Sequence, residues 1–225
     1  MTAPTPTYWL EPTEQVAAGL RRYTRRDTDG GWTCAEGWHE ALVFTGTEPA
    51  ESRNTDHGRV LAHRPDVAHD DPRWPAECAR GCGYQFTDGD VWQEWQEQLY
   101  RRADTGEVVT LRPRRDYDPP GAPTPAPPGA MWNAWWMPDT PAWRGPDGMA
   151  LMVRLPDGHD WHVDGEASNC TRKGDHTHKC WVRQGDPRTG SVTAGKDGDT
   201  CAAGAGSIAS TGYHGFLRDG VLTAG

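Results

Sequence analysis

Residues 149–163 read MALMVRLPDGHDWHV, and they carry the clearest structural signal in the chain. Two alternating runs, Met149–Leu155 and Asp160–Val163, flank Pro156-Asp157-Gly158, which has the composition of a tight turn. This pattern predicts an antiparallel hairpin. Two later segments, residues 180–185 (CWVRQG) and 215–220 (GFLRDG), share an order of residue types that predicts a strand entering a turn. We therefore expect antiparallel β-hairpins in the C-terminal half.

The N-terminal half has patterns of a different kind. In Glu11–Arg26, Val16, Leu20 and Tyr23 recur at helical spacing, and Asp90–Arg102 has a narrow apolar stripe. Both segments predict short helices. Strands are predicted at Ala41–Thr45 and Val108–Arg112, and a long polar loop at Glu48–Pro75. The expected fold class is accordingly α+β, with short N-terminal helices.

Composition predicts a loop-rich chain. The 225 residues are only 35% hydrophobic and include 27 Gly and 19 Pro, although 12 Trp can fill much of a small core. The run DPPGAPTPAPPGA predicts an extended connector over residues 113–129, between a helical and loop region (1–112) and a Trp-rich β region (130–225). The same run also fits a surface loop within one domain, and the sequence leaves both readings open.

Charge and hydropathy narrow the classes of function. A net charge of −9 disfavours a protein that tracks nucleic-acid phosphates. There is no apolar run of membrane-spanning length and no signal-peptide pattern at the N-terminus. We therefore expect no membrane partner and a cytoplasmic location. The oligomeric state is not predictable from these features.

The first group of candidate metal ligands is centred on Cys78-Ala-Arg-Gly-Cys82-Gly83, which is similar to a zinc knuckle but has one residue more between the cysteines. Cys34 and His39 lie in another Gly-punctuated turn and would complete a set of three sulfurs and one nitrogen. His57 and His63 compete for the fourth place. Free thiols with solvated histidines are the alternative.

The second group consists of Cys170, His176, His178, Cys180 and Cys201. If Asp175–Val182 is extended, the period of two places His176, His178 and Cys180 on one face, where Cys170 or Cys201 could join them. Structural thiols or an incidental His-rich turn remain the alternative. The two groups together predict one or two structural zinc ions that stabilise a thin core.

Catalytic arrangements are less well supported. A Cys nucleophile would need Cys170 beside His178 or His214. Asp160, His162 and Asp164 share one face of a strand and could hold a metal, but a solvent-facing hairpin has the same alternation. The Trp-rich residues 131–143 fit either a stacking platform or packing in the core. Because prolines interrupt this segment, we favour packing in the core.

The stretches APPGAMWNAWWMPD, MVRLPDGHDWHVDG with SNC, HKCWVRQG, TCAAGAGSI and YHGFLRDG resemble those of uncharacterised proteins encoded by bacteriophages of actinobacteria. The resemblance covers the chain from about Cys78 to its end and carries no assigned ligand or catalytic residue. It implies a viral protein in an infected host.

We therefore expect a non-catalytic, zinc-stabilised accessory protein that binds a host or phage protein in the host cytoplasm. The alternatives are a virion component, such as a minor capsid or decoration protein, and a metal- or Cys-dependent hydrolase.

Overall fold

The computed structural model describes residues 3–23, 39–49, 51–55, 58–62, 76–78, 82–87, 91–114, 121–175, 177–195, 200–201 and 203–225. Over these residues the chain is built from β-strands, with two single-turn 3₁₀-helices, η2 (Pro141–Trp143) and η3 (Pro187–Thr189). No helix among them is long and apolar enough to span a membrane. The expected α+β class is therefore wrong, because the described part of the chain is mostly β-sheet.

The strands form two larger sheets and two separate hairpins. The four-stranded sheet has the order β1 (Thr5–Pro6), β16 (Val221–Ala224), β15 (His214–Arg218) and β14 (Ser207–Ala209). The eight-stranded sheet has the order β11 (Asp160–His162), β10 (Leu151–Arg154), β9 (Ala130–Asn133), β2 (Tyr8–Tyr23), β6 (Val91–Arg102), β7 (Val108–Thr110) and β8 (Thr124–Pro125), and β3 (Glu40–Pro49) also pairs with β2. The separate hairpins are β12 (Val182–Gln184) with β13 (Thr193–Gly195), and β4 (Glu51–Thr55) with β5 (Gly58–Ala62).

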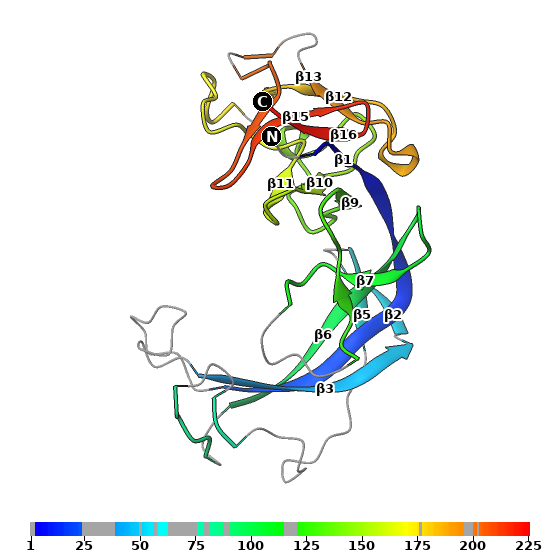
Figure 1. Cartoon of the computed structure of the whole chain (residues 1–225), viewed down its shortest axis with the longest axis vertical. Coiled ribbons are helices and arrows are strands. Elements are labelled where there is room, and N and C mark those ends of the chain that lie inside the picture. The colour runs from blue at the N-terminus through cyan, green and yellow to red at the C-terminus, as the bar shows by residue number, and fades with distance from the viewer. Residues whose placement is uncertain are drawn as a thin grey trace.

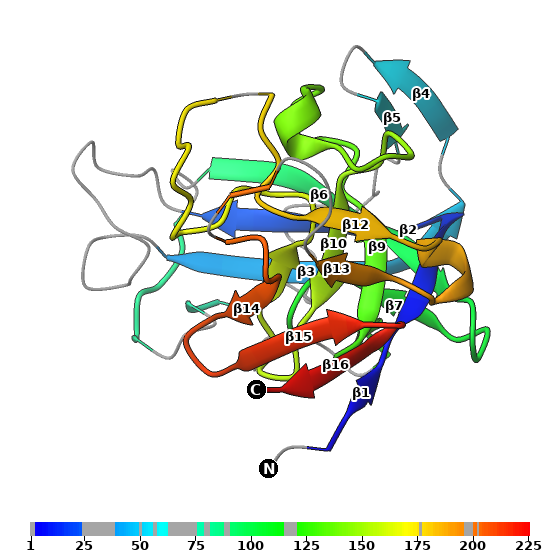
Figure 2. The ribbon, with the colours of Figure 1, turned by 90° about the horizontal axis from the view of Figure 1, so that it is seen from above.

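The long strand β2 connects the two parts of the molecule. In Figure 1 it runs from the upper part, beside β1, down to the lower part, where it lies between β3 and β6. Its first residues, Tyr8 and Trp9, pair in parallel with β9, and the rest pairs antiparallel with β6 and β3. Viewed from above, β14, β15, β16 and β1 lie side by side as one sheet, with the C-terminus beside it (Figure 2).

Both predicted N-terminal helices are strands. Residues 11–23 of the first segment lie in β2, and residues 91–102 of the second form β6; Asp90 and residues 24–26 lie outside the described residues. A spacing of four residues, as between Val16 and Leu20, fits a helical turn but also keeps two residues on the same face of a strand. The tertiary structure decides between these periods, because β2 pairs with β3 and β6 over these residues. The neighbouring residues Val16 and Ala17 are each 1% exposed, so both faces of β2 are covered at this point.

Side chains that alternate along β2 contribute to two different apolar cores. Tyr8 packs in the smaller core with Leu10, Tyr100 and Trp132, whereas its neighbour Trp9 packs in the larger core of the C-terminal strands. Successive strand residues point to opposite faces, so one short segment anchors both cores.

The C-terminal hairpin prediction is confirmed. β10 and β11 pair antiparallel with Val153 opposite Trp161, and Gly158 closes the turn at a φ of +86°, a conformation that favours glycine. The predicted strands at Ala41–Thr45 and Val108–Arg112 are also present, as β3 and β7. The long-loop prediction for Glu48–Pro75 is wrong in part, because β4 and β5 form a hairpin within it.

The end of the Pro-rich segment packs onto the eight-stranded sheet. Its residues Thr124 and Pro125 form the edge strand β8, parallel to β7, and Ala126 is 2% exposed. An edge position suits proline because it lacks an N–H for a second neighbour.

Candidate metal centre

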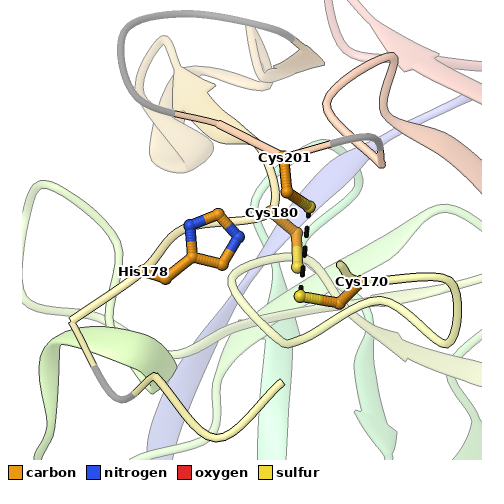
Figure 3. Close-up of side chains that lie close together, drawn as sticks. All are labelled: Cys170, His178, Cys180 and Cys201. Atoms are coloured by element: carbon orange, nitrogen blue, oxygen red, sulfur yellow. Dashed lines mark hydrogen bonds between the residues drawn. The ribbon is translucent and has the colours of Figure 1, made fainter. Parts of the chain in front are cut away.

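Four side chains converge at the margin of the larger core: Cys170, His178, Cys180 and Cys201, here called the C-terminal cluster. Their ligand atoms all lie within 4.8 Å of one another. The sulfur atoms and the imidazole ring face the same small space (Figure 3). Cys170, His178 and Cys180 are buried, and Cys201 is partly exposed. The cluster is close enough to bind one metal ion.

Loops rather than strands position these ligands. Cys170 lies in the loop after β11, Cys180 lies just before β12, and Cys201 lies between β13 and β14. A turn at Asp175, whose carbonyl accepts the His178 N–H at 3.0 Å, directs the imidazole toward the sulfurs. The extended conformation predicted for Asp175–Val182 is therefore wrong at this point, and the turn instead brings His178 and Cys180 together.

Backbone N–H groups point at all three sulfurs of the cluster. Cys170 accepts from Arg172 at 3.3 Å, Cys180 from Ala167 at 3.3 Å, and Cys201 from Ala203 at 3.4 Å. In two of these cases the donor lies two residues after the cysteine, which is the geometry of a tight turn around a ligand. Such hydrogen bonds stabilise a thiolate, the form of cysteine that binds metals.

His178 is buried without hydrogen-bond partners. The residue is 7% exposed, and neither ring nitrogen has a hydrogen-bond partner among the described residues. A buried polar group in this state costs free energy unless something else satisfies it. A metal ion bound between the imidazole and the sulfurs would satisfy one nitrogen.

The thiols of the cluster differ in acidity. Burial raises the pKa of Cys180, and its two neighbouring thiols add to this effect. Burial also raises the pKa of Cys201, but the Ala203 N–H and the neighbouring His178 side chain lower it by more than burial raises it. The net pKa therefore lies below the ordinary value. One thiolate thus forms readily while a second is disfavoured. A cation among the three sulfurs would remove that conflict.

A second group, here called the knuckle cluster, consists of His39, Cys78 and Cys82. Their ligand atoms also lie within 4.8 Å of one another, and His39 Nδ1 is 3.1 Å from Cys82 Sγ. Other residues named as candidates from the sequence, Cys34, His57, His63 and His176, lie outside the described residues.

The alternative acidic site does not assemble on the hairpin. Asp160 pairs with Arg154 at 2.8 Å, His162 stacks on Trp143 with ring centroids 5.1 Å apart, and Asp164 is buried against Arg183 at 3.1 Å. Sequence reasoning missed the role of Arg183, whose fully buried guanidinium also pairs with Asp147 at 2.6 Å. No local spacing signals this contact, because Asp147 lies 36 residues from Arg183.

The Trp-rich segment divides between core and surface. Trp132 is 2% exposed, whereas Trp135 and Trp136 are 37% and 50% exposed. The two exposed rings are nearly perpendicular, at 85°, so they do not form a flat stacking platform. Trp135 borders a cavity of about 290 Å³ that Trp9, Tyr100 and Arg188 also line.

The fold and the two clusters define a β-sheet protein with Cys/His groups close enough to bind metal ions. Comparisons with protein-family models, with curated proteins and with solved structures returned no significant match.

Proposed function

We propose that this protein is a non-catalytic phage accessory protein that binds a host or phage protein and is stabilised by zinc at the C-terminal cluster. The observation that carries the zinc assignment is the buried, unpartnered imidazole of His178 facing three cysteine sulfurs. The phage role rests on the sequence resemblance alone.

The donor set favours zinc over other metals. Three thiolates and one imidazole are a standard tetrahedral zinc set, whereas magnesium and calcium prefer oxygen ligands. Four protein ligands leave no coordination position for a substrate, which is typical of structural rather than catalytic zinc. This supports a stabilising role for the ion.

The ion would join three loops around one hairpin. The hairpin of β12 and β13 has only two strands, and such hairpins are marginally stable alone. Cys180 enters this hairpin, Cys201 follows it, and Cys170 belongs to the preceding loop. Zinc at the cluster would therefore fix both ends of the hairpin to the rest of the core.

Binding of a protein partner is supported by the surface beside the cavity. Trp135 and Trp136 are large apolar side chains that are exposed. Tryptophan and arginine are enriched at protein interfaces, and Arg188, with a side chain 59% exposed, lies at the same cavity. The net charge of −9 opposes nucleic acid as a general partner.

Metal analysis of the purified protein tests the zinc assignment. Protein prepared under reducing conditions should contain zinc, and Cys201→Ser or His178→Ala should lose one equivalent and melt at a lower temperature. The exposed His214 on β15 provides the matched control, since His214→Ala should change neither value. A hydrolase would instead lose an activity in Cys170→Ser with no change in melting temperature.

The accessory role is tested in infected cells. Mass spectrometry should detect the protein in the cell lysate and not in purified particles. Its presence in particles would favour the alternative of a virion component.

A further inference from the structure

The knuckle cluster lies at a point where three strands of the eight-stranded sheet begin or end. Tyr23 ends β2 and pairs with Glu40 at the start of β3 and with Val91 at the start of β6. His39 immediately precedes β3, and the segment with Cys78 and Cys82 precedes β6. The three side chains therefore come from the two segments that precede β3 and β6, the strands that pair with β2.

A small hairpin holds the two cysteines. Glu77 and Gln85 form an antiparallel bridge, the Cys78 N–H donates to the Tyr84 carbonyl at 2.9 Å, and the Phe86 N–H donates to the Ala76 carbonyl at 3.0 Å. Gly83 follows Cys82 at a φ of +80°, which lets the chain turn back directly after the second sulfur. The sulfur atoms of Cys78 and Cys82 lie within 4.8 Å of each other.

The imidazole is oriented by an aromatic contact with that hairpin. The His39 ring stacks on Tyr84 with centroids 4.0 Å apart and planes 6° apart, and its Nδ1 faces Cys82 Sγ. The histidine is thus directed at the sulfurs from a segment 39 residues before Cys78. Two sulfurs and one nitrogen from two distant segments converge on one point.

We infer that the knuckle cluster is a second zinc centre, independent of the C-terminal cluster, which ties the start of β3 to the segment leading into β6. Thiolate and imidazole are the ligands that zinc prefers. The three described donors leave the fourth position of the tetrahedron to water or to another side chain. Cys82 is exposed, whereas three of the four residues in the C-terminal cluster are buried.

This difference in exposure predicts a difference in exchange. A chelator reaches an exposed thiolate ligand more readily than a buried one, so the ion of the knuckle cluster should leave first. The prediction does not depend on the proposed accessory function, because it concerns ligands from a separate part of the chain.

The experiment measures zinc bound per chain in full-length protein reconstituted with zinc under reducing conditions. The wild type should hold two equivalents, and a chromogenic chelator should remove them in two kinetic phases. Cys82→Ser and His39→Ala should each hold one equivalent and lose the fast phase. Cys201→Ser should hold one equivalent and keep the fast phase.

Gln85→Ala is the matched control in the same hairpin, because Gln85 is exposed and is not a ligand. It should retain two equivalents. Cobalt substitution provides a second readout that distinguishes the two sites. In Cys82→Ser, the thiolate-to-cobalt absorption of the C-terminal cluster, which has three thiolates, should remain. The absorption of the knuckle cluster, which has two thiolates, should be lost.

One equivalent in the wild type, unchanged in Cys82→Ser and abolished in Cys201→Ser, would overturn the second centre and leave the proposed zinc of the C-terminal cluster intact. One equivalent abolished by Cys82→Ser alone would support the knuckle centre and contradict the C-terminal one.

Discussion

Cys170 Sγ and Cys201 Sγ lie 3.9 Å apart, although 31 residues separate the two cysteines in the chain. The loop between them contains His178, Cys180 and the hairpin of β12 and β13. Closing a loop of this length costs conformational entropy, which a metal ion that bridges its ends can offset. In the proposed zinc-bound protein, metal binding and folding would therefore be coupled at the C-terminal cluster.

Removal of the metal should destabilise the protein. A ligand that binds only the folded state stabilises it by about 2.7 kcal/mol when its free concentration is one hundred times its dissociation constant. Thermal melting with and without a chelator should show a large fall in melting temperature, reversed by added zinc. The Cys201→Ser variant should respond much less, and an equal response in that variant would contradict the assignment.

The buried guanidinium of Arg183 should be essential for stability. It contacts Asp164 at 3.1 Å and Asp147 at 2.6 Å, and the Asp164 side chain is 3% exposed. Arg183→Ala leaves a buried carboxylate without its partner, so the free energy of unfolding should fall by about 3–5 kcal/mol in chemical denaturation. Arg188→Ala is the control: that side chain is 59% exposed and 4.0 Å from Asp186, so the change should be below about 1 kcal/mol.

The same ion pair predicts a loss of stability in acid. Burial raises the pKa of the Asp147 carboxyl, but hydrogen bonds from Arg183 and the Met149 N–H, with the charge of Arg183, bring it below the ordinary value of 3.8. The folded state thus binds this proton less readily than the unfolded state. Its contribution is complete above pH 3.8 and is lost as the pH falls through the lowered pKa. In denaturation measured across this range, Asp147→Asn should show a shallower dependence on pH than the wild type, and an unchanged slope would contradict the assignment.

Gly220 should tolerate no side chain. It has a φ of +72°, and an added Cβ would overlap the carbonyl oxygen of Gly190. Gly106 is the matched control, because its φ is +76° but nothing lies within 4 Å of the added atom. Gly106→Ala should cost about 1–2 kcal/mol for the left-handed backbone alone. Gly220→Ala should cost clearly more in the same unfolding assay, and equal losses would show that the turn adjusts freely.

Local signals predicted the parts of the structure that depend on neighbouring residues. The turn Pro156-Asp157-Gly158 lies between two alternating runs, and β10 and β11 follow from it directly. The turn residues around Cys78 and Cys82 also identified the knuckle cluster, whereas the period of two that grouped His178 with Cys180 assumed an extended segment that is a turn in the structure. The sequence left open whether Cys170 or Cys201 joins His178 and Cys180, and the fold brings both to the cluster through the intervening loops.

The sequence by itself determined a Trp-rich, acidic chain with C-terminal hairpins and two groups of candidate metal ligands. Only the tertiary structure decided that residues 11–23 and 91–102 are strands, because the spacing of four from Val16 to Leu20 and from Trp95 to Leu99 fits both the helical and the strand period. Pairing of β2 with β3 and β6 satisfies the backbone hydrogen bonds of that segment and selects the strand. The same long-range packing placed Arg183 between Asp147 and Asp164, a contact without any local pattern to predict it.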